Sequence, residues 1–338
     1  MYTNKTFPLR IILFFCWREL LWFTLLSVAV LVAYKGLGWT FIAIPFLPVA
    51  TIGTAVAFYV GFKNNSSYER LWEARRIWGA ITNASRSWAT LVNTTVGREQ
   101  FDENPDAVIR LRRQLILRQV GWVNALRLQL RRRVLWQEDP RVRSLHVKLV
   151  EQQHRQAEEM HSTLEPFLPT FELACTDCGA TNVPNLLLHA HATQLAELKT
   201  RGLLDPFEHN TLSALLVECF AQQGAAERIK SFPFPRQYAH FSTIFVCLFT
   251  FLLPFALIGE MAKFGPNAVW LDLPFSILIS WVFFSMESIG DASENPFENG
   301  LNDIPMTAIC RNIEIDLREL LGDAPLPERI QAVDGVLL

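Results

Sequence analysis

The chain has 338 residues, half of them hydrophobic, and its 25 phenylalanines and 10 tryptophans make it unusually aromatic. Its formal net charge is only −2, which gives no reason to expect a nucleic-acid partner. The six cysteines are scattered and some lie in apolar runs, which argues against the disulfide framework of a small secreted protein.

Long apolar stretches predict helices that cross a membrane. Residues 36–62 and 237–259 contain no Asp, Glu, Lys or Arg, and each exceeds the roughly 20 residues that span a bilayer core. The first predicted span contains Arg18 and Glu19 near its N-terminal end, where Arg can reach the interface, and the last is short and interrupted by Pro274. No small-residue cleavage site follows the first apolar stretch, so we expect it to be retained. The four predicted spans cover residues 11–34, 40–62, 240–259 and 271–286.

The distribution of basic residues predicts the orientation. Of the 31 Lys and Arg residues, 23 lie within 63–236, whereas the candidate outer loops 35–39 and 261–270 carry one each. The first ten residues carry Lys5 and Arg10. Because basic residues collect on the cytoplasmic side, we expect both termini and the large middle segment to be cytoplasmic.

The middle segment is predicted to be helical, which makes the whole chain an all-α fold. Apolar residues recur at helical spacing within 106–162, and Asp205 followed by Pro206 is a typical helix start. The proline-rich stretch 165–185 is predicted to be a loop. The other predicted helices cover 183–198 and 205–229. The predicted organisation is residues 1–62 (N-terminus and two spans), 63–238 (cytosolic domain), 239–290 (two spans) and 291–338 (cytosolic C-terminal segment).

Two stripes with a spacing of four run along the second predicted span. Gly53, Ala57 and Gly61 form a small-residue stripe of the kind that lets helices approach closely. Beside it lie Thr54, Phe58 and Phe62. If several copies surround an axis, one stripe can pack while the other faces the axis, and an apolar ring there can gate ions by dewetting. The alternative is that the phenylalanines face lipid or other helices.

Three further features suit ligand binding but also have simpler readings. The acidic stretch 285–306 can bind a cation or supply solvated and capping carboxylates. Eight arginines within 110–133 can bind a polyanion, form a positive vestibule wall or be a solvated helix face. Cys175 and Cys178, with His189 and His191 downstream, can bind zinc, do redox work or form a plain loop. The two His are only two residues apart. No hydrolase or nucleotide-binding motif occurs, so we do not expect an enzyme.

Two segments together resemble the bestrophin family of ion channels, in its bacterial branch. These are FYVGFKNNSSYERLWEARRIWG after the second span and ENPFENGLNDIPM after the last. CWREL near the N-terminus and FPRQY before the third span fit more loosely. The similarity covers roughly residues 5–320 in order, and its NPF segment is the most specific part.

The resemblance implies an all-helical homopentamer in a bacterial inner membrane, with one central pore for small monovalent ions. It implies a hydrophobic neck at Thr54, Phe58 and Phe62, where Thr54 departs from a wholly apolar family neck. It also implies a cytosolic constriction near Leu216, with Leu212 or Leu215 as alternatives.

The resemblance leaves the metal and the charge selectivity open. Animal members hold calcium after the NPF motif; here Asn295 and Asp303 match, but Gly300 and Leu301 stand where acids are expected. We therefore expect no cofactor, with calcium and zinc both disfavoured. Relatives include anion channels and monovalent-cation channels. A secondary transporter is a competing reading, although no inverted repeat is evident, and a membrane-anchored scaffold is another.

Overall fold

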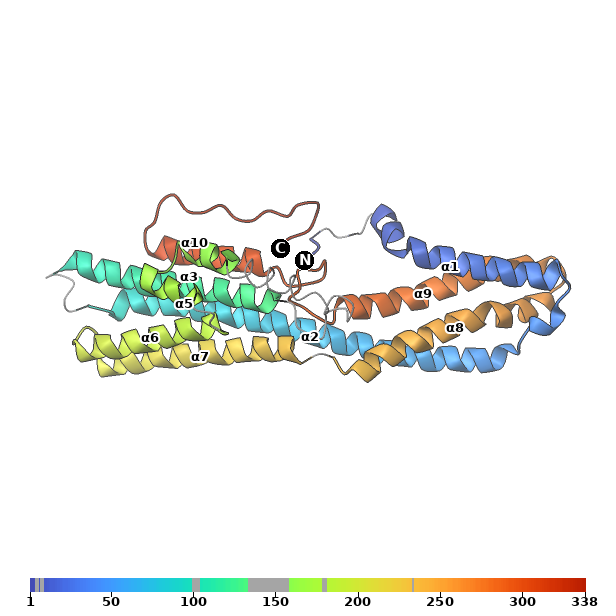
Figure 1. The fold of residues 1–338 in the computed structure, drawn as a ribbon, viewed down its shortest axis with the longest axis horizontal. Coiled ribbons are helices and arrows are strands. Elements are labelled where there is room, and N and C mark those ends of the chain that lie inside the picture. The colour runs from blue at the N-terminus through green and yellow to red at the C-terminus, as the bar shows by residue number, and fades with distance from the viewer. Residues whose placement is uncertain (4–5, 7–8, 99–103, 133–157, 178–180, 233) are drawn as a thin grey trace. The chain divides into compact units, whose positions relative to one another are not determined.

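The computed structural model describes the chain except for residues 4–5, 7–8, 99–103, 133–157, 178–180 and 233 (Figure 1). Within this part the regular structure is helical, apart from isolated β-bridges of which one joins Tyr2 to Val336. The all-α fold expected from the sequence is thereby confirmed. The helices are α1 (Leu9–Lys35), α2 (Phe46–Thr95), α3 (Pro105–Arg131), α5 (Thr170–Asp177), α6 (Val183–Thr200), α7 (Pro206–Ser231), α8 (Arg236–Ala262), α9 (Asp272–Ala292) and α10 (Met306–Leu320), with short 3-10 helices at Thr40–Ile42 and Ala268–Leu271.

The chain divides into two compact units. One, here called the apolar unit, comprises residues 4–71 and 233–295, and the other, the polar unit, comprises 1–3, 72–232 and 296–338. The C-terminal residues 296–338 belong to the polar unit. Its helix α10 packs against α3 of the same unit, where the Cys310 Sγ lies 3.5 Å from the Val123 carbonyl oxygen.

Four helices of the described chain are long and apolar enough to cross a membrane, which supports a multi-pass membrane protein. Helix α9 is longer than the predicted last span because Pro274 lies in its first turn, where a missing backbone N–H breaks no helical bond. Helix α8 likewise continues through Pro254. The stretches that qualify are Cys16–Lys35, Thr40–Thr95, Arg236–Ala262 and Ala268–Ala292.

The apolar unit is built on helix α8. In it α8 contacts both α9 and α1, and α1 contacts α9 (Figure 1). Buried Val56 and Val60 of α2 share a core with Phe249 and Leu253 of α8. A buried hydrogen bond of 2.7 Å between the Ser27 and Ser276 hydroxyls adds a polar tie between α1 and α9.

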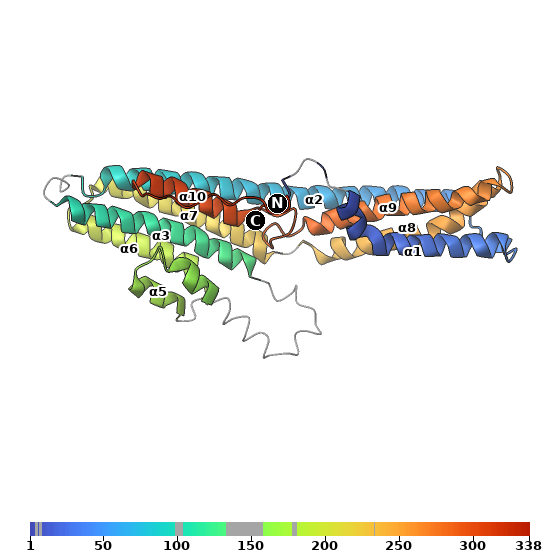
Figure 2. The same cartoon turned by 90° about the horizontal axis from the view of Figure 1, so that it is seen from above.

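The polar unit packs α3 against α6, α7 and α10 (Figure 2). Helix starts are set by local sequence: Asn104, Asn182 and Asp205 each cap a helix that has proline in its first turn. Asp205 forms a reciprocal capping box with Glu208, as expected from the Asp-Pro pair. Trp88 and the other fully buried aromatic and aliphatic side chains then fill the core.

Two predictions for the polar unit need correction. The stretch 165–185 is not simply a loop, because α5 forms between its prolines; Pro169 precedes the helix and does not interrupt it. The predicted helix over 106–162 is found as α3 and as a helical turn at 158–164, and residues 133–157 between them lie outside the described part.

Candidate pore-lining site

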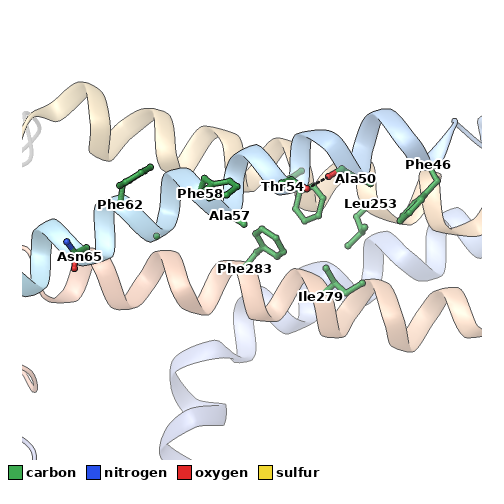
Figure 3. Close-up of a pocket in the computed structure, with 13 residues that line it drawn as sticks. Phe46, Ala50, Thr54, Ala57, Phe58, Phe62, Asn65, Leu253, Ile279 and Phe283 are labelled. Atoms are coloured by element: carbon green, nitrogen blue, oxygen red, sulfur yellow. Dashed lines mark hydrogen bonds between the residues drawn. The ribbon is translucent and has the colours of Figure 1, made fainter.

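Helix α2 carries the predicted neck residues on one exposed face. A spacing of four brings Thr54, Phe58 and Phe62 to the same side of a helix (Figure 3). All three are exposed in the single chain, and the exposed fractions of Phe58 and Phe62 are 67% and 73%. Large aromatic side chains this exposed have no partner within the described subunit that covers them, so their face is available to a membrane or to another copy.

This face borders an apolar groove of about 800 Å³. The groove runs along α2 and is closed on its other side by α8 and α9, with Phe283 and Ile279 of α9 opposite the neck residues (Figure 3). It is lined by Phe46, Ala50, Gly53, Thr54, Ala57, Phe58, Gly61, Phe62, Asn65, Phe249, Leu253, Ile279 and Phe283. The lining carries no ionisable side chain, so the groove has no fixed charge of its own.

Thr54 is less polar in this setting than its residue type suggests. Its Oγ1 donates a 3.0 Å hydrogen bond to the Ala50 carbonyl oxygen of the preceding turn (dashed in Figure 3). The hydroxyl proton is therefore engaged by the helix backbone, and the side chain offers a methyl group and an acceptor only.

The small-residue stripe divides between two environments. Gly53 is buried beneath the Phe249 ring of α8, and a Cβ on Gly53 would lie 2.5 Å from the Phe249 Cε2. Gly61 is exposed, and a Cβ there would meet no described atom within 4 Å. Ala57, between them, is half-buried. Close packing at Gly53 is thus made within the subunit, while the role of Ala57 and Gly61 in packing against a second copy stays a prediction.

A buried ion pair anchors α2 directly after the neck. The Lys63 Nζ donates to the Glu287 Oε1 at 2.6 Å and to the Asp291 Oδ1 at 2.5 Å, both on α9. Lys63 and Glu287 are almost fully buried. Ser242 and Thr243 of α8 also donate to the Glu287 carboxylate. Three helices therefore meet at one carboxylate.

Sequence reasoning missed the pairing of Lys63 with Glu287. The signals were a lysine at the end of the uncharged run and a glutamate in the acidic stretch 285–306. Neither the spacing along one helix nor the composition indicates which acid of that stretch meets the lysine, because the two partners are 224 positions apart.

Helix α7 carries the three residues considered for the cytosolic constriction. Within the single subunit, Leu216 is only 3% exposed and Leu212 is fully buried. Leu215 is half-buried. Which of these residues faces an opening in an assembly stays a prediction. The apolar residues that α7 exposes most are Phe207 and Val217, at 80% and 67%.

The two residues that match the calcium pattern belong to different units. Nowhere in the described ranges do three His, Cys, Asp or Glu side chains gather as a metal site would require. Asn295 belongs to the apolar unit and Asp303 to the polar unit. Asp303 is buried, and its carboxylate accepts the Gly300 N–H at 2.8 Å. Burial raises the pKa of the Asp303 carboxyl, which opposes the charged form that a calcium ligand needs.

The zinc candidates are also separated. His189 is exposed whereas His191 is fully buried, because positions two apart point to different sides of α6. The side chain of Cys175 and all of Cys178 lie outside the described residues. The two histidines cannot share one metal ion in this arrangement.

The arginine-rich stretch is partly internal and not only a solvated face. Buried Arg118 donates from its Nε to the Glu172 Oε2 at 2.7 Å. Arg113 pairs with Asp323, and Arg127 is also buried. Arg133 lies outside the described residues.

Comparison with known proteins agrees with this architecture. Residues 10–319 match the model of a family described as bacterial/fungal bestrophin protein. The chain is 30% identical over 309 residues to the voltage-dependent anion channel-forming protein YneE of Escherichia coli K12, covering 91% of this chain and 86% of that protein. It is 26% identical to a protein of the same description from Mesorhizobium japonicum, covering 82% and 76%.

Solved structures give the same result. A bacterial bestrophin homologue from Klebsiella pneumoniae matches with a TM-score of 0.71 and 25% identity over 90% of this chain and 98% of that one. Since the family model covers most of the chain and the fold agrees, this protein is a member of the bacterial/fungal bestrophin family of membrane channels.

Proposed function

We propose that this protein is a homopentameric channel that passes small monovalent ions passively across the bacterial inner membrane, with both termini in the cytoplasm. The observation that carries the proposal is the exposed row of Thr54, Phe58 and Phe62 on α2. Five copies of this row around an axis make a narrow apolar neck, and such a constriction controls ion flow by wetting and dewetting.

The uncovered groove beside this row supports assembly from copies of the same chain. Closed rings of identical subunits use one surface repeatedly, and an apolar face left open in the subunit is buried when the ring closes. Ala57 and Gly61 border the groove and leave room for close approach of a neighbouring helix.

The names of the similar proteins favour anions as the permeant ions. The relatives from Escherichia coli and Mesorhizobium japonicum are both described as voltage-dependent anion channel-forming proteins. The neck itself has no fixed charge, so sodium or potassium is the alternative that the experiment must separate from chloride.

Reconstitution into a planar bilayer under a NaCl gradient tests the proposal. An anion channel gives single-channel steps whose reversal potential has the sign expected for chloride, and a cation channel gives the opposite sign. Saturable exchange without steps would indicate a transporter, and the absence of both would leave the scaffold reading. Multi-angle light scattering of the same sample checks the pentamer.

A further inference from the structure

A second cavity, of about 290 Å³, lies inside the polar unit. Helices α3 and α10, the segment 163–167 and Ile330 of the C-terminal stretch form its walls. Its size is at the lower end of the roughly 300–1,000 Å³ typical of small-molecule pockets. It therefore suits a compact ligand.

The walls of this cavity carry an excess of positive charge. Arg127 and Arg311 line it, together with one acid, Glu314. That acid is already paired, because it lies 3.2 Å from Arg311 and 2.9 Å from a third arginine, Arg318. Arg318 does not line the cavity and is also paired with Asp323 at 3.2 Å. Within the lining itself, two guanidinium groups thus stand against a single carboxylate.

Of the arginines at this cavity, Arg127 has the charge that is least balanced by carboxylates. It is 8% exposed, and among the described residues it forms no ion pair with a carboxylate. Its buried Nε has no hydrogen-bond partner within the described part of the chain. A buried guanidinium left in this state is costly, so a native protein commonly supplies an anion.

A second orphaned group lies on the same cavity. The Thr307 Oγ1 is buried and has no partner among the described atoms. Thr163 and Asn124 add further polar groups to the wall. Buried polar atoms are paired in the great majority of proteins, and an unpaired set around one cavity indicates a missing water, ion or ligand.

We propose that this cavity binds a small soluble oxyanion, a phosphate or a dicarboxylate, held by Arg127 and Arg311 with Thr307 as a further donor. Guanidinium groups bind such anions through paired, charge-assisted hydrogen bonds. The bound anion joins α3, α10 and the segment 163–167, so it stabilises the polar unit. The site is distinct from the groove on α2 and does not depend on the channel proposal.

Thermal unfolding of the full-length protein in detergent tests this site. Inorganic phosphate and succinate are titrated separately, with sodium chloride at matched ionic strength as the reference. We expect a saturable rise in melting temperature with one or both oxyanions, beyond the effect of chloride. No rise beyond chloride with either probe would overturn the proposal.

Three variants locate the effect. Arg311→Gln should weaken the binding at least about tenfold, the usual loss for a charge-assisted hydrogen bond. Thr307→Val keeps the side-chain shape and removes an orphaned hydroxyl, so the ligand-free protein should be as stable as wild type while the oxyanion response falls. Arg201→Gln is the matched control, because the Arg201 side chain is 68% exposed directly after α6 and is not part of the cavity lining.

An unchanged response in both Arg311→Gln and Thr307→Val would place any binding elsewhere and overturn the assignment. Binding is measured without ion flow, so failure here leaves the channel proposal intact. Conversely, a protein without conductance can still show the oxyanion response.

Discussion

The Lys63 Nζ lies 2.6 Å from the Glu287 Oε1, and the lysine follows directly after Phe62 of the candidate neck. Both side chains are almost completely buried. The pair therefore fixes the α2 face that carries Phe58 and Phe62 relative to α9. The geometry of the neck depends on a charge pair outside it.

Removing one partner of this pair should strongly destabilise the protein. Lys63→Met leaves the Glu287 carboxylate buried without its cation, which typically costs about 3–5 kcal/mol. We expect a large fall in melting temperature in detergent, partly restored in Lys63→Met/Glu287→Met because no buried charge then remains unpaired at this position. Lys263→Met is the control, since Lys263 is 68% exposed. Equal effects of Lys63→Met and Lys263→Met would show that the pair is unimportant.

Truncating the aromatic neck should increase ion flow. The double variant Phe58→Ala/Phe62→Ala widens and wets the apolar constriction, so single-channel conductance should rise. Phe275→Ala provides the control, because Phe275 is an exposed aromatic on α9 that does not line the groove. If the double variant gives the single-channel current of wild type, these side chains do not line the pore.

Substitutions along the small-residue stripe should separate folding from assembly. Gly53→Ala places a Cβ 2.5 Å from Phe249 and should destabilise the subunit by about 1–3 kcal/mol, whereas Gly61→Ala should fold normally. Ala57→Leu should weaken or distort the oligomer by overpacking. Melting temperature measures the first effect and light scattering the second. An Ala57→Leu protein with unchanged oligomer size and conductance would mean that the stripe faces elsewhere.

His191 should make the polar unit sensitive to acid. Its ring contacts Trp88 at 4.6 Å between centroids, and both ring nitrogens lack a hydrogen-bond partner among the described residues. Burial, and then the nearby Arg118 charge, lowers the pKa of His191 well below its ordinary 6.5. The folded state therefore favours neutral His191. The contribution of this histidine to the free energy of unfolding is fully present above pH 6.5.

As the pH falls below 6.5, the free energy of unfolding should decrease by up to about 1.4 kcal/mol per pH unit. Urea unfolding between pH 7.5 and roughly 5 measures this slope. His191→Leu should flatten it, and His189→Leu, which changes an exposed position of the same helix, should leave it unchanged. Equal slopes in wild type and His191→Leu would assign the acid sensitivity to other groups.

Calcium should not be required for activity. Asp303 is 3% exposed, and its carboxylate accepts a hydrogen bond from the backbone N–H of Gly300. The carboxylate is therefore already engaged within its own loop. Fewer charged ligands give weaker calcium binding, of order 10⁻⁴–10⁻³ M at best. Open probability should be the same in buffered nanomolar and micromolar calcium. A steep rise over that range that disappears in Asp303→Ala would reverse this conclusion.

The fold was predictable wherever a local pattern decides the structure. Uncharged runs predicted the membrane spans, and Asp205 followed by Pro206 predicted the start of α7. Both features are set by a continuous stretch of sequence, through its hydropathy and its capping residues. The i, i+4 spacing also identified the α2 face that is exposed in the structure. The pattern did not show that α2 continues to Thr95, since the charged residues after Phe62 mark the end of a span and not the end of a helix.

Long-range pairings were not predictable. Leu216 fits an apolar constriction by residue type, but its burial depends on how α7 packs on α3 and α6. Arg118 and Arg127 look like solvated charges in a run of arginines, yet both are buried. A single sequence contains no signal that distinguishes an arginine with a distant acid from one in water.

Residues 1–3 and 335–337 lie side by side within the polar unit. The Leu337 N–H donates to the Met1 carbonyl oxygen and the Thr3 N–H to the Gly335 carbonyl oxygen, each at 2.8 Å, and the Met1 ammonium donates to the Leu337 carbonyl oxygen. Residues 1–3 and 335–337 therefore hold one another through backbone hydrogen bonds, so displacing either segment would expose the unpaired backbone groups of the other.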